Sequence, residues 1–149
     1  NPLFFCNSIR NIDDEVLRAL VKKNGFIGLS LYPYHLKNYG DCKLEDFCMM
    51  IHKLENIIGI DHIGIGSDLC KNWSDAVVVW MRKGKWTKKL NYGESRTKSS
   101  TWPKQPSWFK KGSDIINIYH GLLKSGMKEQ NVFKILGYNW FDFMKRSFG

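Results

Sequence analysis

The pattern of hydrophobic and polar positions in the first 68 residues predicts a helix, a strand, a second helix and a second strand. Residues 11–25 combine an apolar stripe with acids at the start and lysines at the end, as expected of a helix. Asn11 or Asp13 suits its N-cap, and Gly25 suits the left-handed position that follows a last turn. The apolar stripe consists of Val16, Leu17, Leu20 and Val21.

Two short, nearly all-apolar stretches, residues 26–32 and 62–67, have the composition of strands buried on both faces. A second amphipathic helix lies between them, with Asp41 as its expected cap and Gly59 at its end. This order, with tight connections, predicts parallel βα units. Because two strands do not make a stable parallel sheet, we expect the sheet to continue in residues outside this sequence or in a partner chain.

The second half of the chain is predicted to be helical. A short helix is expected at 75–82, and a longer one at 115–124 with Ser113 and Asp114 as its cap. A third is expected at 129–136, ended by Gly137, and a fourth at 140–148.

Charge is concentrated in one segment. The net charge is +9, and residues 82–111 hold ten basic residues and one acid, while the other 13 basic and 13 acidic residues cancel. The segment also contains Trp86, Trp102 and Trp108, and basic residues interleaved with aromatics suit a single-stranded nucleic acid. No motif of a known nucleic-acid module accompanies them, so a solvated insertion is favoured over a nucleic-acid site.

Composition and residue spacing narrow the classes of protein to which this chain can belong. No apolar stretch reaches the roughly 18–20 residues of a membrane span, and residues 1–10 do not resemble a secretory signal, so we expect a soluble chain. The cysteines (Cys6, Cys42, Cys48, Cys70) lack metal-type spacing and are expected to be reduced. The histidines (His35, His52, His62, His120) form no zinc motif, so no metal ligand is expected among them.

Four ordered motifs resemble the membrane dipeptidase family (renal dipeptidase, peptidase M19). They are Arg-Asn-Ile-Asp-Asp at 10–14, Gly-Phe-Ile-Gly-Leu-Ser-Leu-Tyr-Pro at 25–33, Ile-Gly-Ile-Asp-His-Ile-Gly-Ile-Gly-Ser-Asp at 58–68 and Lys-Ile-Leu-Gly-Tyr-Asn-Trp at 134–140. The resemblance implies an α/β fold, the C-terminal part of a (β/α)8 TIM barrel of the metal-dependent hydrolase type with its last two strands and C-terminal helices. Residues 1–149 would then be a single partial domain carrying an insertion at about 82–111.

The same resemblance implies the site. In such barrels the chemistry lies at the carboxyl ends of the strands, where the pattern above places Arg10, Tyr32 and Asp68. Asp68 would contact the substrate amine and take part in proton transfer, Arg10 would bind the substrate carboxylate, and Tyr32 would line the pocket. Two zinc ions are implied, with their ligands upstream and the last histidine two residues before Asn1.

The expected function is hydrolysis of small dipeptides by a zinc dipeptidase, with this chain inactive alone. Asp68-Leu-Cys-Lys departs from the Asp-Phe-Asp-Gly that is frequent in the family, which alters the pocket mouth. The alternatives are a non-catalytic barrel relative and a module that binds an anionic partner through residues 82–111. The resemblance favours a bacterial branch, and we expect a cytoplasmic location and a homodimer as the assembly to test.

Overall fold

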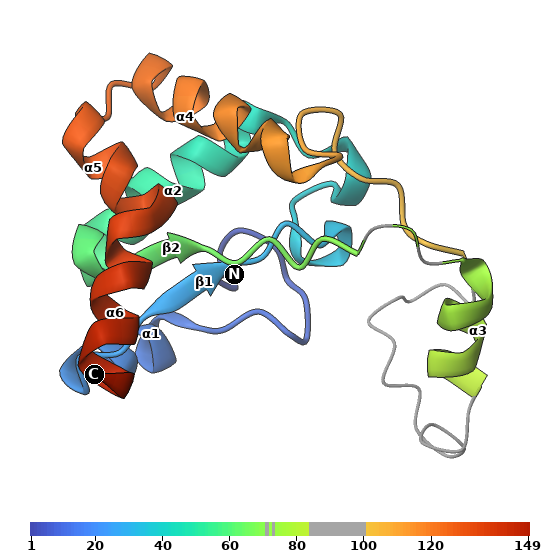
Figure 1. Ribbon diagram of the computed structural model, residues 1–149, viewed down its shortest axis with the longest axis horizontal. Helices are drawn as coiled ribbons and strands as arrows, with labels where there is room; N and C mark the ends of the chain where they lie inside the picture. Colours follow the sequence, from blue (N-terminus) through green and yellow to red (C-terminus); the bar gives the residue numbers. More distant parts are fainter. Residues whose placement is uncertain (71, 73, 84–100) are drawn as a thin grey trace.

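A computed structural model describes residues 1–70, 72, 74–83 and 101–149 (Figure 1). Strands β1 (Ile27–Leu29) and β2 (Ile63–Ile65) pair in parallel, with Ile27 opposite Ile63 and Leu29 opposite Ile65. Helix α1 (Asp14–Lys22) precedes β1, and α2 (Leu44–Ile58) connects the two strands. The predicted element order and parallel pairing are confirmed, although both strands are shorter than predicted.

The later helices are α3 (Asp75–Lys83), α4 (Ile115–Lys124), α5 (Glu129–Phe133) and α6 (Asn139–Phe148). In Figure 1 both strands point toward α3, whereas α6 crosses near their amino ends and α2 and α4 lie together on another side. None of the helices in the described ranges combines the length and the apolar character that crossing a membrane requires.

Helix α1 begins as predicted but ends differently. The Asp13 carboxylate accepts a hydrogen bond from the Val16 N–H at 2.8 Å, so Asp13 rather than Asn11 is the cap. The left-handed residue after the helix is Asn24 (φ 53°), so the prediction for Gly25 was wrong. Gly25 serves close packing instead, because a Cβ there would lie 2.7 Å from Leu20 Cγ.

Helix α2 ends as predicted at Gly59, whose φ of 80° favours glycine. The predicted Asp41 cap was wrong, because Lys43 precedes the helix and makes no side-chain capping bond. Asp41 instead pairs with Lys104 Nζ at 2.8 Å, and both side chains are largely exposed. The Asp41 carboxylate, which the local sequence predicted as the cap of α2, therefore binds a lysine from a distant segment instead.

Helix α4 has the predicted bounds, but Asp114 makes no side-chain capping bond to it. Its Oδ2 accepts the backbone N–H of Lys110 at 2.8 Å and of Lys111 at 3.0 Å. The Lys110 N–H bond is the main cause that lowers the pKa of this carboxyl. Asp114 thus stabilises the 3-10 turn Gly112–Asp114, which leads into α4.

Gly137 does not end a helix, contrary to the prediction. Helix α5 runs through a π-helical turn (Lys134–Tyr138) directly into α6. The Asn139 amide donates to the carbonyls of Ile60 (2.7 Å) and Ile63 (2.8 Å), and Trp140 Nε1 donates to that of Ile65 (2.8 Å). These bonds hold the helix on β2, and the wider turn lets both neighbouring side chains reach the strand.

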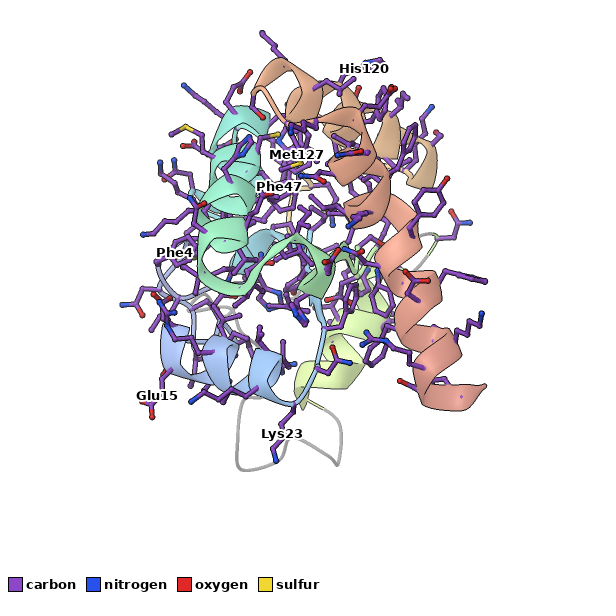
Figure 2. The ribbon with its side chains drawn as sticks, turned by 90° about the vertical axis from the view of Figure 1, so that its left-hand side faces the viewer. Phe4, Glu15, Lys23, Phe47, His120 and Met127 are labelled. Atoms are coloured by element: carbon purple, nitrogen blue, oxygen red, sulfur yellow. The ribbon has the colours of Figure 1, made fainter. Side chains whose placement is uncertain are left out.

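The core lies between the strands, α1, α2 and the later helices. Figure 2 shows Phe47 and Met127 inside the molecule and Glu15, Lys23 and His120 at its periphery. The largest fully buried side chains come from several elements: Phe47, Phe109, Leu17, Leu29, Leu31, Leu36, Ile51, Leu54, Ile63, Ile118, Leu122 and Ile135.

One end of the proposed 82–111 insertion belongs to this core. Trp108 and Phe109 are buried, and Trp108 Nε1 donates to the Cys42 carbonyl at 2.8 Å. The interpretation of the whole segment as solvated was therefore wrong for these residues, since an indole with a bonded N–H packs well against apolar neighbours. Residues 84–100, with Trp86, lie outside the described residues.

Burial also sets the chemistry of two thiols. Desolvation is the main cause that raises the pKa of Cys42 and of Cys48 to about 12 each. Because the thiolate is the nucleophile, both groups should be inert at neutral pH, whereas Cys70 is exposed.

Labelling of the native protein with iodoacetamide at pH 8 should therefore modify Cys70 rapidly and spare Cys42 and Cys48 until the chain is denatured. Peptide mass spectrometry of timed samples measures this. Equal rates at Cys70 and Cys48 in the native protein would contradict the burial of the Cys48 thiol.

Replacing Gly64 by alanine should destabilise the fold by about 2 kcal/mol or more, since overpacking has costs of this order. The added Cβ would lie 2.3 Å from Phe26 Cζ and 2.8 Å from Trp140 Nε1. Gly137→Ala is the matched control, because nothing lies within 4 Å of a Cβ there. Urea unfolding of both variants compares them, and equal midpoints would argue against the Trp140 contact.

Candidate functional site

Two of the predicted site residues follow the paired strands at the same edge. Beyond the strands, Gly66 N–H donates to the Leu29 carbonyl at 2.9 Å, and Leu31 N–H donates to that of Ser67 at 3.2 Å. The two segments therefore remain side by side up to Leu31 and Ser67. Tyr32 and Asp68 are the next residue on each segment, which places both at the carboxyl edge of the sheet.

Asp68 is exposed and has a left-handed backbone (φ 54°). Non-glycine residues rarely take this conformation, and aspartate and asparagine take it more readily than other types. Beyond β2 the chain continues toward α3 (Figure 1). Such unusual backbone geometry is frequent at functional sites, although it does not by itself assign a role.

Tyr32 is half-buried, and its backbone N–H donates to Ser30 Oγ at 3.1 Å. Its ring makes edge contacts with Tyr34 (centroids 5.6 Å apart) and with His35 (5.2 Å). The 3-10 turn Pro33–His35 follows directly, closed by a bond from the His35 N–H to the Tyr32 carbonyl at 2.9 Å. The ring thus packs within an aromatic cluster at the carboxyl edge.

Arg10 is exposed on a loop whose two ends lie together. Pro2 and Ile12 form a parallel bridge, Leu3 N–H donates to the Ile12 carbonyl at 2.6 Å, and Ile12 N–H donates to that of Asn1 at 2.9 Å. The loop packs against α2, since Phe5 is buried and contacts the ring of Phe47. Arg10 lies on this loop immediately before Asn11.

Two buried asparagines attach this loop to the end of β1. The Asn1 amide donates to the carbonyls of Ser30 (2.9 Å) and His35 (3.0 Å) and accepts the Ser30 N–H (2.9 Å). The Asn11 amide donates to the carbonyls of Cys6 (2.8 Å) and His35 (3.1 Å). One carbonyl, that of His35, therefore joins the chain start, the Arg10 loop and the turn after Tyr32.

Sequence reasoning considered Asn11 only as a helix cap and did not single out Asn1. The sequence did contain an indication of this role. Asp13 already suits the N-cap of α1, so the Asn11 amide is not needed as a cap and can bind elsewhere. The His35–Ser30 contact, Nδ1 to Oγ at 2.8 Å, completes this polar cluster, and the pattern of residue types gave no indication of it.

The described residues do not form a zinc site by themselves. No group of three or more His, Cys, Asp or Glu side chains within them is arranged to hold a metal ion. His62 Nδ1 donates to the Gly25 carbonyl at 2.7 Å, and His52 Nε2 contacts Ser125 Oγ at 2.8 Å. Both rings therefore have partners within the fold.

Two open pockets in the described part of the chain lie away from the predicted residues. One, of about 690 Å³, is at the amino end of β2 and is lined by Asp61, His62 and Arg146 among others. The other, of about 470 Å³, lies where Trp108 meets the start of α2. The chemistry suggested by Arg10, Tyr32 and Asp68 therefore does not coincide with either hollow.

The fold is that of a class of hydrolases with known structures. The chain is similar to an amidohydrolase from Pseudomonas aeruginosa, with a TM-score of 0.79 and 27% identity over 97% of this chain and 42% of that one. It also has the fold of a metallo peptidase from Rhodobacter sphaeroides solved with a phosphinate mimic of the dipeptide L-Ala-D-Ala. There the TM-score is 0.66 and the identity 17%, over 93% of this chain and 32% of that one.

The chain belongs to the membrane dipeptidase family (peptidase family M19), whose sequence profile matches residues 1–77, just over half of it. Arg10, Tyr32 and Asp68 all fall within the matched part. Dipeptidase aclJ of Aspergillus oryzae is 35% identical over an alignment of 69 residues that covers 42% of this chain and 15% of that protein. The chain thus spans less than half the length of each of these relatives.

The left-handed backbone at position 68 yields a stability prediction. Asp68→Ala should destabilise the protein by about 1 kcal/mol, because alanine tolerates positive φ poorly, whereas Asp68→Asn should leave stability nearly unchanged. Urea unfolding of the two variants measures the difference. Equal stability of the alanine and asparagine variants would argue that the turn at Asp68 relaxes without strain.

Proposed function

We propose that the intact protein carrying this chain is a metal-dependent dipeptidase. The observation that supports it most is that the family match covers Arg10, Tyr32 and Asp68, and that the backbone bonds bring Tyr32 and Asp68 to one edge. In barrels of this class, that edge is where the chemistry occurs. A carboxylate, a guanidinium and an aromatic ring there suit a small zwitterionic peptide.

In this proposal Arg10 binds the C-terminal carboxylate of the dipeptide, because a planar guanidinium can donate two parallel hydrogen bonds to it. Asp68 binds the free amine and exchanges a proton with it or with the leaving nitrogen. Tyr32 forms one wall of the pocket. The separation of the two charged residues then limits the length of the substrate, which favours dipeptides over longer peptides.

We further propose that residues 1–149 are one partial domain, the last two strands and C-terminal helices of a (β/α)8 barrel. The short parallel sheet supports this, because two strands alone seldom form a stable parallel sheet. Zinc remains part of the proposal as the cofactor of the intact enzyme, held by residues outside this chain. The chain alone is then expected to be inactive.

The substrate class is supported by one neighbour of the same fold, whose structure holds a mimic of L-Ala-D-Ala. We propose small dipeptides as substrates of the intact protein and keep a cytoplasmic location and a homodimer as predictions. Gel filtration with light scattering tests the dimer.

The alternative is a non-catalytic relative or a module that binds an anionic partner through residues 82–111. Within the described part of that segment, Lys104 pairs with Asp41, and Trp108 is buried with its N–H bonded. Trp108 therefore serves the core rather than an exposed nucleic-acid surface. Together with the family match, this favours the enzyme over the binding module.

The intact polypeptide, purified with zinc, should release free amino acids from alanyl-alanine. Asp68→Asn should lower kcat by about 100-fold or more, since positioned acid–base groups contribute that much. Asparagine suits the left-handed backbone, so lost activity would not reflect lost folding. No hydrolysis of any dipeptide by the metal-loaded intact protein would refute the proposal.

A further inference from the structure

The loop that carries Arg10 is held from within by the Asn11 side chain, in addition to the backbone bonds at its ends and the packing of Phe5 on Phe47. Asn11 is buried, and its amide uses both hydrogens: one bonds the Cys6 carbonyl inside the loop, and the other bonds the His35 carbonyl outside it. Backbone bonds tighten the same turn, from Asn11 N–H to the Ser8 carbonyl at 3.0 Å and from Ser8 N–H to that of Cys6 at 2.8 Å.

The outer partner of Asn11 is well fixed. The His35 carbonyl ends the 3-10 turn that begins after Tyr32, and it also accepts the Asn1 amide at 3.0 Å. His35 is itself buried, with Nδ1 against Ser30 Oγ at 2.8 Å. A carbonyl held in this way provides a rigid reference point, at the carboxyl edge of the sheet, for whatever bonds to it.

We propose that Asn11 is a positioning residue for substrate binding, which sets the place of the Arg10 guanidinium relative to Tyr32 and Asp68. This inference rests on the proposed dipeptidase function. Arg10 is one residue from Asn11, so the bond to the His35 carbonyl determines where the arginine backbone lies. The neighbouring residue Ile9 is 92% exposed, so apolar packing does not hold the tip of the loop.

The geometry predicts a particular kinetic effect. Two parallel hydrogen bonds from a guanidinium to a carboxylate depend on orientation, so a loosened loop weakens binding of the carboxylate. The reacting centre, to which Asp68 belongs, is attached to the other strand and is not affected directly. Loss of Asn11 should therefore raise KM and leave kcat nearly unchanged.

The test compares Asn11→Ala with Asn139→Ala in the intact protein, with alanyl-alanine as substrate. Asn139 is a matched control, because its buried amide also donates to two backbone carbonyls, those of Ile60 and Ile63. Both variants should lose thermal stability. Only Asn11→Ala should raise KM, by about tenfold, with kcat changed less than about twofold.

A double-mutant cycle identifies the route of the effect. If Asn11 acts through Arg10, Asn11→Ala should have no further effect on KM in an Arg10→Ala background. Additive effects of the two substitutions, or an equal KM in Asn11→Ala and Asn139→Ala, would overturn the proposal.

Hydrogen exchange separates this inference from the proposed function. Amides of residues 5–10 should exchange faster in Asn11→Ala than in the wild type, and not in Asn139→Ala, whether or not the protein hydrolyses dipeptides. A wild type without dipeptidase activity would end the proposed function and the substrate role of Arg10. Unchanged exchange in the loop would overturn the role of Asn11 itself.

Discussion

The contact on which much of the described fold depends is that between the Trp140 indole and the glycines of the two strands. A Cβ at Gly28 would lie 2.8 Å from Trp140 Cζ2, and one at Gly64 would lie 2.8 Å from Nε1. Only glycine leaves room for the ring, and the indole N–H then bonds the Ile65 carbonyl. Phe26 completes the contact with its ring centroid 4.5 Å from that of Trp140.

This contact links the two ends of the chain, because a helix near residue 140 covers strands formed before residue 66. It also explains the π-helical turn between α5 and α6. A regular helix through Gly137 would rotate Asn139 and Trp140 relative to β2, and the extra residue in the turn corrects their direction. The carbonyls of Ile60, Ile63 and Ile65 would otherwise lack these side-chain partners.

The opposite, carboxyl edge of the sheet is organised by polar bonds rather than by apolar packing. Buried amides of Asn1 and Asn11 meet at one carbonyl, and each bond is worth more than it would be in water because an unpaired buried polar group is costly. Such a cluster orients exposed groups around it without covering them. Family membership and this arrangement together make the carboxyl edge the candidate position of the functional site.

The sequence by itself determined several local features: a cap for α1 at Asn11 or Asp13, the end of α2 at Gly59 and the bounds of α4. It also placed Tyr32 and Asp68 after successive parallel strands. These features depend on periodicity and capping within a few residues, which a single chain displays directly.

Only the tertiary structure decided where Asp41 pairs, that α5 continues into α6, that Trp108 is buried and that Asn11 holds the Arg10 loop. Each of these depends on a partner far along the chain, such as the carbonyl of Cys42 for Trp108, 66 residues away. Local propensity carries no information about such partners, because the free energy of the contact arises only when the segments meet.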